Sequence, residues 1–102
     1  MNILLVCSAG MSTSMLVSKM REAAESKGVT CQIDAVSASH LEDYLEKTDV
    51  ILIGPQVRYM QAQVTKQAEP HGIKVDLINQ MDYGMMKGEN VLNQAMNLAD
   101  VM

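Results

Sequence analysis

Two short runs of uninterrupted apolar residues limit what this chain can fold into. They are Ile3–Val6 and Val50–Ile53, and strands of this kind are covered on both faces of a sheet. Two other segments, Cys31–Ala35 and Ile73–Leu77, alternate apolar and polar residues, which is typical of strands with one exposed face. Stretches with helical spacing separate the four segments, so the sequence predicts an α/β domain with a parallel sheet.

The predicted sheet is open, with the two continuous runs at its centre and helices on both faces. Right-handed crossovers then give the spatial order 2-1-3-4, with strands numbered along the chain. We expect the 102 residues to form a single domain, 1–102. The expected helices are Ser12–Lys27, His40–Glu46, a segment from Gln56 that ends before Pro70, and Glu89–Ala99, with Met81–Gly88 as a loop or short turn.

This strand order predicts where a ligand binds. The connections reverse direction between strands 1 and 3, and ligands of open α/β sheets bind beyond the carboxyl ends of the strands at such a point. Cys7 directly follows the first strand, and Gly54-Pro55-Gln56 follows the third. Two separate arguments therefore place a candidate site beside Cys7.

The loop after Cys7 combines a thiol with small hydroxylated residues at a helix start. Backbone N–H groups at a helix N-terminus bind anions, and the same field favours the nucleophilic thiolate of a nearby cysteine. The pattern points to phosphoryl chemistry on Cys7. Met11 is unusual in such a loop, and both packing inward and a place on a docking surface remain open for it. The candidate phosphate-binding residues are Ser8, Ala9, Gly10, Met11, Ser12, Thr13 and Ser14.

Cysteine phosphatases use a similar loop with the pattern C-x5-R, whose arginine clamps the phosphate. Here the corresponding position is Thr13, and the chain has no Asp-Pro pair to supply a general acid. Hydrolysis of a phosphocysteine needs such groups, so their absence favours a carrier that passes the phosphoryl group on. A low-molecular-weight phosphatase or arsenate-reductase-like enzyme is the alternative. A response-regulator-like binding module lacks support, because the acidic cluster that holds Mg²⁺ is missing.

Charge and composition exclude several other classes. The net charge of −4 argues against nucleic-acid binding, and no apolar run reaches the roughly 18–20 residues that cross a bilayer. No basic region precedes Ile3, so we expect no signal peptide. Cys7 and Cys31 have no metal-ligand spacing, and we expect a cytoplasmic protein with free thiols and no metal or cofactor. The 10 Met residues, in a chain without Phe or Trp, are expected mostly to fill the core.

The chain also resembles a known family over its whole length. The matching motifs are C-S-A-G-M-S-T-S at 7–14, L-V-S-K-M at 16–20, L-I-G-P-Q-V at 52–57 with Tyr59, and Tyr83-Gly84. They are similar to those of enzyme IIB of the phosphoenolpyruvate-dependent sugar phosphotransferase system, lactose/cellobiose/chitobiose class. The resemblance implies that Cys7 takes a phosphoryl group from the phosphohistidine of a IIA protein. A membrane IIC permease would then present the sugar that accepts it, which the resemblance implies is a β-linked disaccharide.

Several further residues have more than one interpretation. His40 and His71 are expected to be ordinary surface residues rather than phosphohistidines. Arg58 and Tyr59 are candidates for contact with phosphate or with a partner. Asp82 is expected to help form a turn. The residues expected to support the loop or a partner are Gly54, Pro55, Gln56, Tyr59, Tyr83 and Gly84.

Overall fold

The computed structural model describes residues 2–7 and 11–100, without the side chains at 11–13, 38 and 100. Its centre is a sheet of four parallel strands, β1 (Asn2–Cys7), β2 (Gln32–Ser37), β3 (Val50–Ile53) and β4 (Lys74–Leu77). Their order is β2-β1-β3-β4, which confirms the predicted architecture. The alternating segment Cys31–Ala35 corresponds to β2, which begins one residue later than expected, at Gln32, and extends to Ser37.

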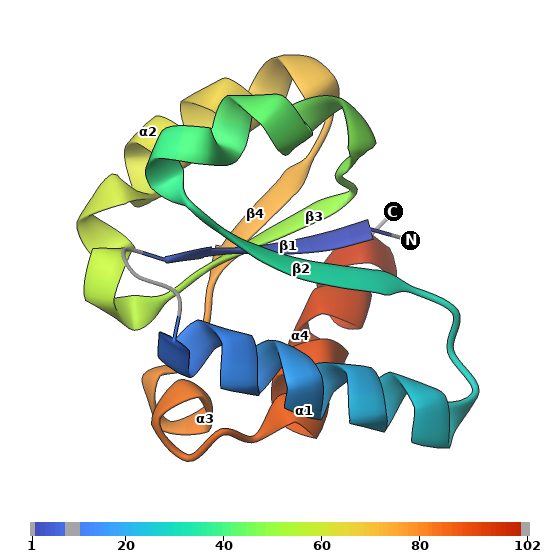
Figure 1. Ribbon diagram of the computed structural model, residues 1–102. Helices are drawn as coiled ribbons and strands as arrows, with labels where there is room; N and C mark the ends of the chain where they lie inside the picture. The colour runs from blue at the N-terminus through green and yellow to red at the C-terminus, as the bar shows by residue number, and fades with distance from the viewer. Residues whose placement is uncertain (1, 8–10, 101–102) are drawn as a thin grey trace.

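Helices cover both faces of this sheet (Figure 1). One face carries α1 (Met11–Lys27) and α4 (Gly88–Asp100), with the short α3 (Gln80–Gly84) beside them. The other carries α2 (Gln61–Ala68) and three 3₁₀ helices, η1 (Ala38–Lys47), η2 (Pro55–Met60) and η3 (Glu69–His71). The sheet is therefore the middle of three layers, as its buried central strands require.

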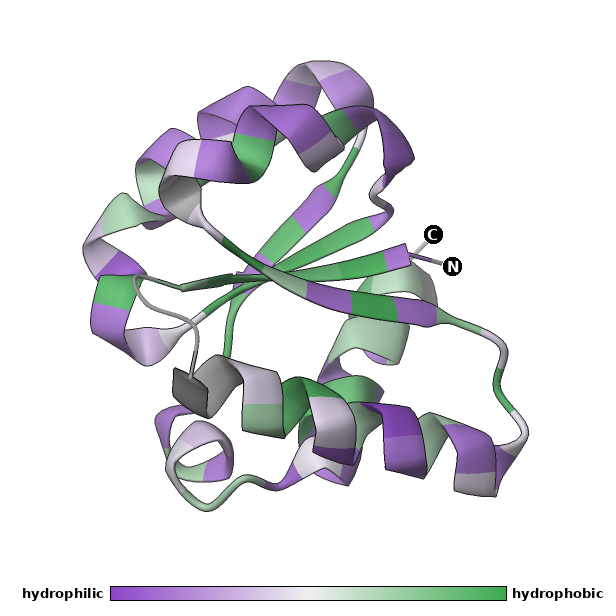
Figure 2. Cartoon of the chain, in the orientation of Figure 1, coloured by the Kyte–Doolittle hydropathy of each residue, from purple (hydrophilic) through white to green (hydrophobic). Residues whose placement is uncertain are grey.

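Alternate residues of the central strands build two separate cores. Ile3, Leu5 and Leu52 pack against α1 and α4, whereas Leu4 and Ile51 pack against η1 and α2. The colours of Figure 2 show this as apolar strands between helices with polar outer surfaces. Each fully buried Leu or Ile side chain contributes about 1.5–3 kcal/mol. The continuous apolar runs are continuous because both faces of their strands are buried.

The first helix ends where the sequence predicts. Gly28 has a left-handed φ of 68°, which glycine adopts without steric cost. Its N–H donates to the Glu25 carbonyl, and the Val29 N–H donates to that of Ala24, so the last carbonyls of α1 are paired. At the start of α4, a Cβ on Gly88 would lie 2.4 Å from the carbonyl carbon of Lys19. Only glycine allows α4 to approach α1 this closely.

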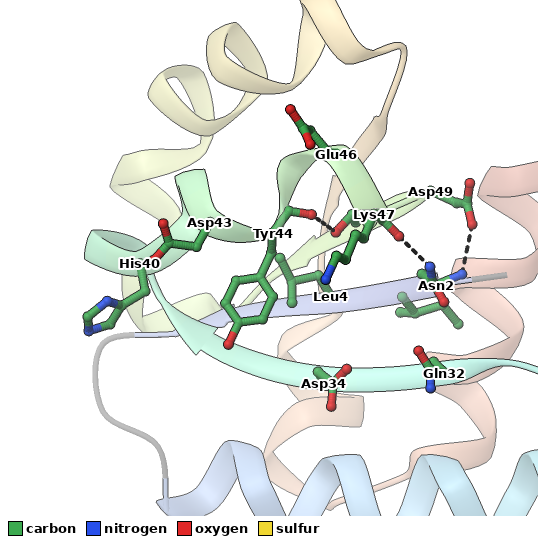
Figure 3. A pocket seen from close by; sticks show the side chains of 12 residues that line it. Asn2, Leu4, Gln32, Asp34, His40, Asp43, Tyr44, Glu46, Lys47 and Asp49 are labelled. Atoms are coloured by element: carbon green, nitrogen blue, oxygen red, sulfur yellow. Dashed lines mark hydrogen bonds between the residues drawn. The ribbon is translucent and has the colours of Figure 1, made fainter.

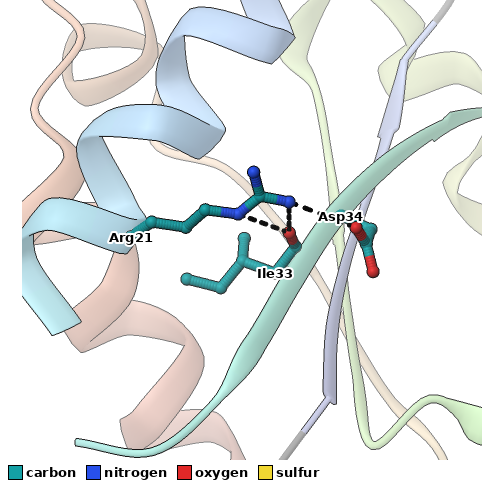
Figure 4. A network of polar contacts seen from close by, with 3 residues as sticks. All are labelled: Arg21, Ile33 and Asp34. Atoms are coloured by element: carbon teal, nitrogen blue, oxygen red, sulfur yellow. Dashed lines mark hydrogen bonds and ion pairs between the residues drawn. The ribbon is translucent and has the colours of Figure 1, made fainter. Parts of the chain in front are cut away.

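Side chains occupy the outer edge of each edge strand. Arg21 on α1 donates from Nη2 and Nε to the Ile33 carbonyl of β2, at 2.6 and 3.2 Å, and pairs with Asp34 at 3.2 Å (Figure 4). On β4, Gln94 of α4 donates to the Leu77 carbonyl at 2.6 Å. Unpaired edge carbonyls are templates for aggregation, and here two of them are taken by side chains.

Two helical predictions need correction. The segment from Gln56 is not one helix, because Val57 has non-helical angles (φ −121°, ψ 27°) where η2 bends before α2. The α-helical part, α2, ends at Ala68, before Pro70 as predicted. Pro70 lies near the start of the following 3₁₀ helix η3, where proline is tolerated. The predicted short helix around Leu41 and Leu45 is present and buries both residues, as the 3₁₀ helix η1.

Candidate functional site at the carboxyl end of the sheet

Cys7 is the last residue of β1 and lies opposite Ser37 of β2. Its side chain is 2% exposed, and its Sγ lies 3.8 Å from the Val36 carbonyl, to which it donates a weak hydrogen bond. The thiol is therefore at the predicted end of the sheet but covered in this conformation.

The predicted phosphate-binding loop lies partly outside the described residues. Ser8, Ala9 and Gly10 are not described, and for Met11, Ser12 and Thr13 the structure gives only the backbone at the start of α1. Ser14 is exposed. The start of α1 follows Cys7 by only a few residues, which is the arrangement that an anion site needs. The contacts of the loop with phosphate, and the role of Met11, stay predictions.

A second wall of the site begins at the end of β3. The Gly54 N–H donates to the Val6 carbonyl at 2.9 Å, one residue before Cys7. A Cβ on Gly54 would lie 2.6 Å from Gln56 Oε1 and 3.3 Å from that same carbonyl. A side chain at position 54 would therefore require the end of the Gln56 side chain, which folds back over this position, to move.

The third part of the site follows β4. Ile78 continues the ladder by donating to the Ile53 carbonyl at 2.9 Å. Asn79 then caps α3, its Oδ1 accepting from the N–H groups of Met81 and Asp82 at 3.0 and 3.2 Å. The sequence predicts a loop or short turn over Met81–Gly88, whereas Gln80–Gly84 form a helix. The signal was present, because an Asn followed three residues later by an acid is a helix-start pattern.

One hydrogen bond joins the second and third parts. Gln56 Nε2 donates to the Tyr83 hydroxyl at 2.7 Å. The two residues are 27 positions apart in the chain, and sequence reasoning did not pair them. Tyr83 is half-buried and packs against the core beneath α1 and α4. The structure thus brings two of the predicted supporting residues into direct contact.

An open groove of about 680 Å³ lies beside this bond. Around it, large apolar side chains remain in solvent: Tyr59 is 78%, Met81 72% and Met85 62% exposed. Met15, in the first turns of α1, is 60% exposed. We call these four side chains the apolar rim. The groove itself is lined by Pro55, Gln56, Arg58, Tyr59, Gln80, Tyr83 and Gly84.

The methionines divide between core and surface. Met20 is fully buried, and Met60, Met86 and Met96 are partly buried against the cores. The prediction of core filling holds for these four of the seven described side chains, whereas the three methionines of the apolar rim are exposed. Cys31 is half-buried against the core, as expected for a packed small residue.

A larger cavity, about 760 Å³, lies elsewhere, between η1 and the strands β1 and β2 (Figure 3). It carries the carboxylates of Asp34, Asp43, Glu46 and Asp49. Asp49 accepts from the N–H of Asn2 at 2.8 Å. His40 is exposed at one end of this charged cleft, and His71 is exposed on η3.

Two searches of the described part of the chain gave negative results. No three His, Cys, Asp or Glu residues there are grouped to hold a metal ion. None of the helices in that part is long and apolar enough to span a membrane.

Comparison with known proteins gives a single answer. Residues 2–94 match the model of the lactose/cellobiose-specific IIB subunit of the phosphotransferase system (PTS). The galactose-specific EIIB component of Lactococcus lactis subsp. cremoris is 48% identical over 101 residues, covering 94% of each chain. The oligo-beta-mannoside-specific EIIB component of Bacillus subtilis is 43% identical over 96 residues, covering 94% of this chain and 93% of its own.

The solved structures agree with the sequence comparisons. The solution structure of the cellobiose-specific IIB component of Borrelia burgdorferi superimposes with a TM-score of 0.81 at 43% identity, covering 98% of this chain and 92% of its own. The components of this family are phosphotransferases that serve sugar transport. The resemblance found in the motifs is therefore confirmed: this chain belongs to the lactose/cellobiose-specific IIB family of the sugar phosphotransferase system.

Proposed function

We propose that Cys7 is the phosphoryl carrier of this IIB protein. The observation that carries the proposal is its position as the last residue of β1, at the carboxyl end of the sheet and just before the start of α1. Membership of the family adds the donor, a phosphorylated IIA protein, and the acceptor complex, a membrane IIC permease with its sugar. The protein then acts in the cytoplasm, as one domain over residues 1–102, without a cofactor.

The proposed reaction has two balanced transfers. The Cys7 thiolate attacks phosphorus, an S–P bond forms, and the N–P bond of the donor phosphohistidine breaks with its electron pair staying on the imidazole. A sugar hydroxyl oxygen then attacks the same phosphorus, the S–P bond breaks, and the thiolate is regenerated while the hydroxyl proton leaves to solvent or a base. Such transfers pass through a loose transition state, so the protein mainly positions groups and stabilises charge. Residues Ser8 to Ser14 are proposed to hold the equatorial oxygens with backbone N–H groups and hydroxyls.

Transfer is favoured over hydrolysis because this chain lacks the groups that hydrolysis needs. Thr13 stands where the phosphatase pattern places arginine. Without that cation and without a general acid, a phosphocysteine would keep its phosphoryl group until a partner accepts it. Steady turnover of an aryl phosphate would instead support the phosphatase alternative.

The sugar is proposed only at the level of class, as a β-linked disaccharide. The relatives are named for galactose, oligo-β-mannosides and cellobiose. Proteins of similar identity to this chain thus serve different sugars. Reconstitution with IIC permeases of each kind, scored by formation of sugar phosphate, would identify the sugar.

The decisive test is the mass of the intact protein after incubation with phosphorylated IIA. We expect the mass of one phosphoryl group to be added, to disappear in Cys7→Ser and to remain in Cys31→Ser. Cys31→Ser is a matched control because Cys31 is half-buried and lies on a different segment from Cys7. An unlabelled parent protein, or a label on histidine, would disprove the proposal.

A further inference from the structure

The Gln56–Tyr83 hydrogen bond is the feature of the site that neither the family match nor the reaction explains. It joins η2, which follows β3, to α3, which follows β4. Both helices lie at the carboxyl end of the sheet, where Cys7 ends β1. The bond therefore connects the part of the site that follows β3 with the part that follows β4.

We propose that Gln56 and Tyr83 are a pair of positioning residues for phosphoryl transfer to Cys7. This inference rests on the proposed function, and it concerns the geometry of the site rather than contact with the phosphoryl group. The pair fixes η2 against α3 at the carboxyl end of the sheet, so that the incoming phosphohistidine and Sγ are aligned for in-line attack.

The path from the pair to Cys7 is short. The Gln56 side chain lies over Gly54 so closely that a Cβ there would be 2.6 Å from Oε1. The Gly54 N–H is in turn bonded to the Val6 carbonyl, directly before Cys7. Gln56 is thus adjacent to the glycine whose N–H is bonded to the residue before Cys7.

The other end of the pair is anchored in the core. The Tyr83 ring packs against the residues beneath α1 and α4, and its helix is capped by Asn79. The hydroxyl is consequently held in place before Gln56 bonds to it. Gln56 is itself exposed, so it gains its fixed orientation from this bond and from its place over Gly54.

A double-mutant cycle tests whether the two side chains act through each other. The variants are Gln56→Ala, Tyr83→Phe, which keeps the ring in the core, and the double variant. Single-turnover transfer from phosphorylated IIA is measured over a range of IIA concentrations. One hydrogen bond corresponds to a rate change of about 3- to 10-fold.

We expect each single variant to lower the saturating rate by that amount, and the double variant to be no slower than the slower single one. Such non-additivity isolates the coupling between the two side chains from any other contact of the hydroxyl. The half-saturating concentration of IIA should change less than two-fold, because a positioning pair does not act by binding the donor. Thermal midpoints show whether each variant is folded.

Matched controls make the same chemical changes elsewhere. Tyr44→Phe alters a tyrosine of η1, and Gln63→Ala alters an exposed glutamine of α2; both should transfer at the parent rate. Additive losses, unchanged rates, or a change confined to half-saturation would overturn the pair as positioning residues. A parent protein that takes no phosphoryl group would instead overturn the proposed function, so the two failures are distinguishable.

Discussion

The surface around Cys7 and the charged cleft between η1 and β2 differ in what they offer a partner. Around Cys7, the four side chains of the apolar rim are between 60% and 78% exposed, and the groove beside them measures about 680 Å³. The cleft is larger, about 760 Å³, yet four carboxylates line it, with Lys47 and His40. The smaller cavity is the one lined by residues that follow β3 and β4, at the end of the sheet where Cys7 ends β1.

This difference shows that cavity volume alone does not identify the site proposed for phosphoryl transfer. Charged side chains at a surface are well solvated and gain little from pairing. Exposed Met and Tyr side chains, in contrast, gain free energy when a partner covers them, and flexible methionines adapt to more than one partner. The proposed carrier, which would meet a donor and then an acceptor complex, needs the second kind of surface.

The largest effect is expected when the apolar rim is made polar. The double variant Tyr59→Ser/Met81→Ser removes two side chains that a partner would bury, and each such contact is worth about 1–2 kcal/mol. We expect the half-saturating concentration of phosphorylated IIA to rise about 30- to 800-fold, with little change in the saturating rate. Single-turnover kinetics separates the two quantities.

The matched control is Tyr44→Ser in the charged cleft, where the side chain is 38% exposed. It should leave the half-saturating concentration unchanged. Equal effects at the two places would remove the functional distinction between the rim and the cleft.

A smaller effect is expected from Gly54→Ala, inside the site. The new Cβ would lie 2.6 Å from Gln56 Oε1, so the Gln56 side chain would have to move and its bond to Tyr83 would break. We expect transfer to slow by about 3- to 10-fold. Because the displaced atom is the end of a flexible side chain, the loss of stability should be only about 1 kcal/mol. Transfer rates and urea denaturation measure the two effects.

An internal control comes from combining Gly54→Ala with Gln56→Ala. Without the glutamine side chain, the nearest neighbour of the new Cβ is the Val6 carbonyl at 3.3 Å, so the glycine substitution should slow transfer no further. A further loss of rate in the double variant would show that Gly54 acts by another route.

The smallest effect on transfer is expected in the cleft itself. Asp49→Ala removes the acceptor for the Asn2 N–H at 2.8 Å, which should reduce the free energy of unfolding by about 1–2 kcal/mol. Transfer to Cys7 should stay at the parent rate when measured well below the thermal midpoint. A loss of transfer in this variant would place the cleft within the functional surface.

Much of the architecture was predictable because the burial of a strand determines the order of apolar and polar residues along it. Ile3–Val6 and Val50–Ile53 are apolar throughout since each of these strands is covered on both faces, whereas β2 and β4 carry polar residues at the edges. That contrast gave the strand order, and the order put Cys7 and Gly54 at one end of the sheet. The positions of these two residues followed from local patterns alone.

Other features depend on contacts between distant segments and produce no such local pattern in the sequence. The bend at Val57 and the 2.7 Å bond between Gln56 and Tyr83 form only when η2 and α3 meet. Gly88 was expected within a loop, yet its lack of a side chain is what lets α4 pack on α1. Composition likewise could not separate the methionines that fill the cores from those of the apolar rim.

The sequence by itself determined the sheet, its order and the place of the cysteine, because alternation, continuous apolar runs and the helix-start pattern are local consequences of burial and hydrogen bonding. The motifs also determined the family. Only the tertiary structure decided that Cys7 is covered and bonded toward Val36, that Gln56 meets Tyr83, and that exposed apolar side chains surround this end of the sheet. These features arise from the packing of elements far apart in the chain, and the residue types alone permit several such packings.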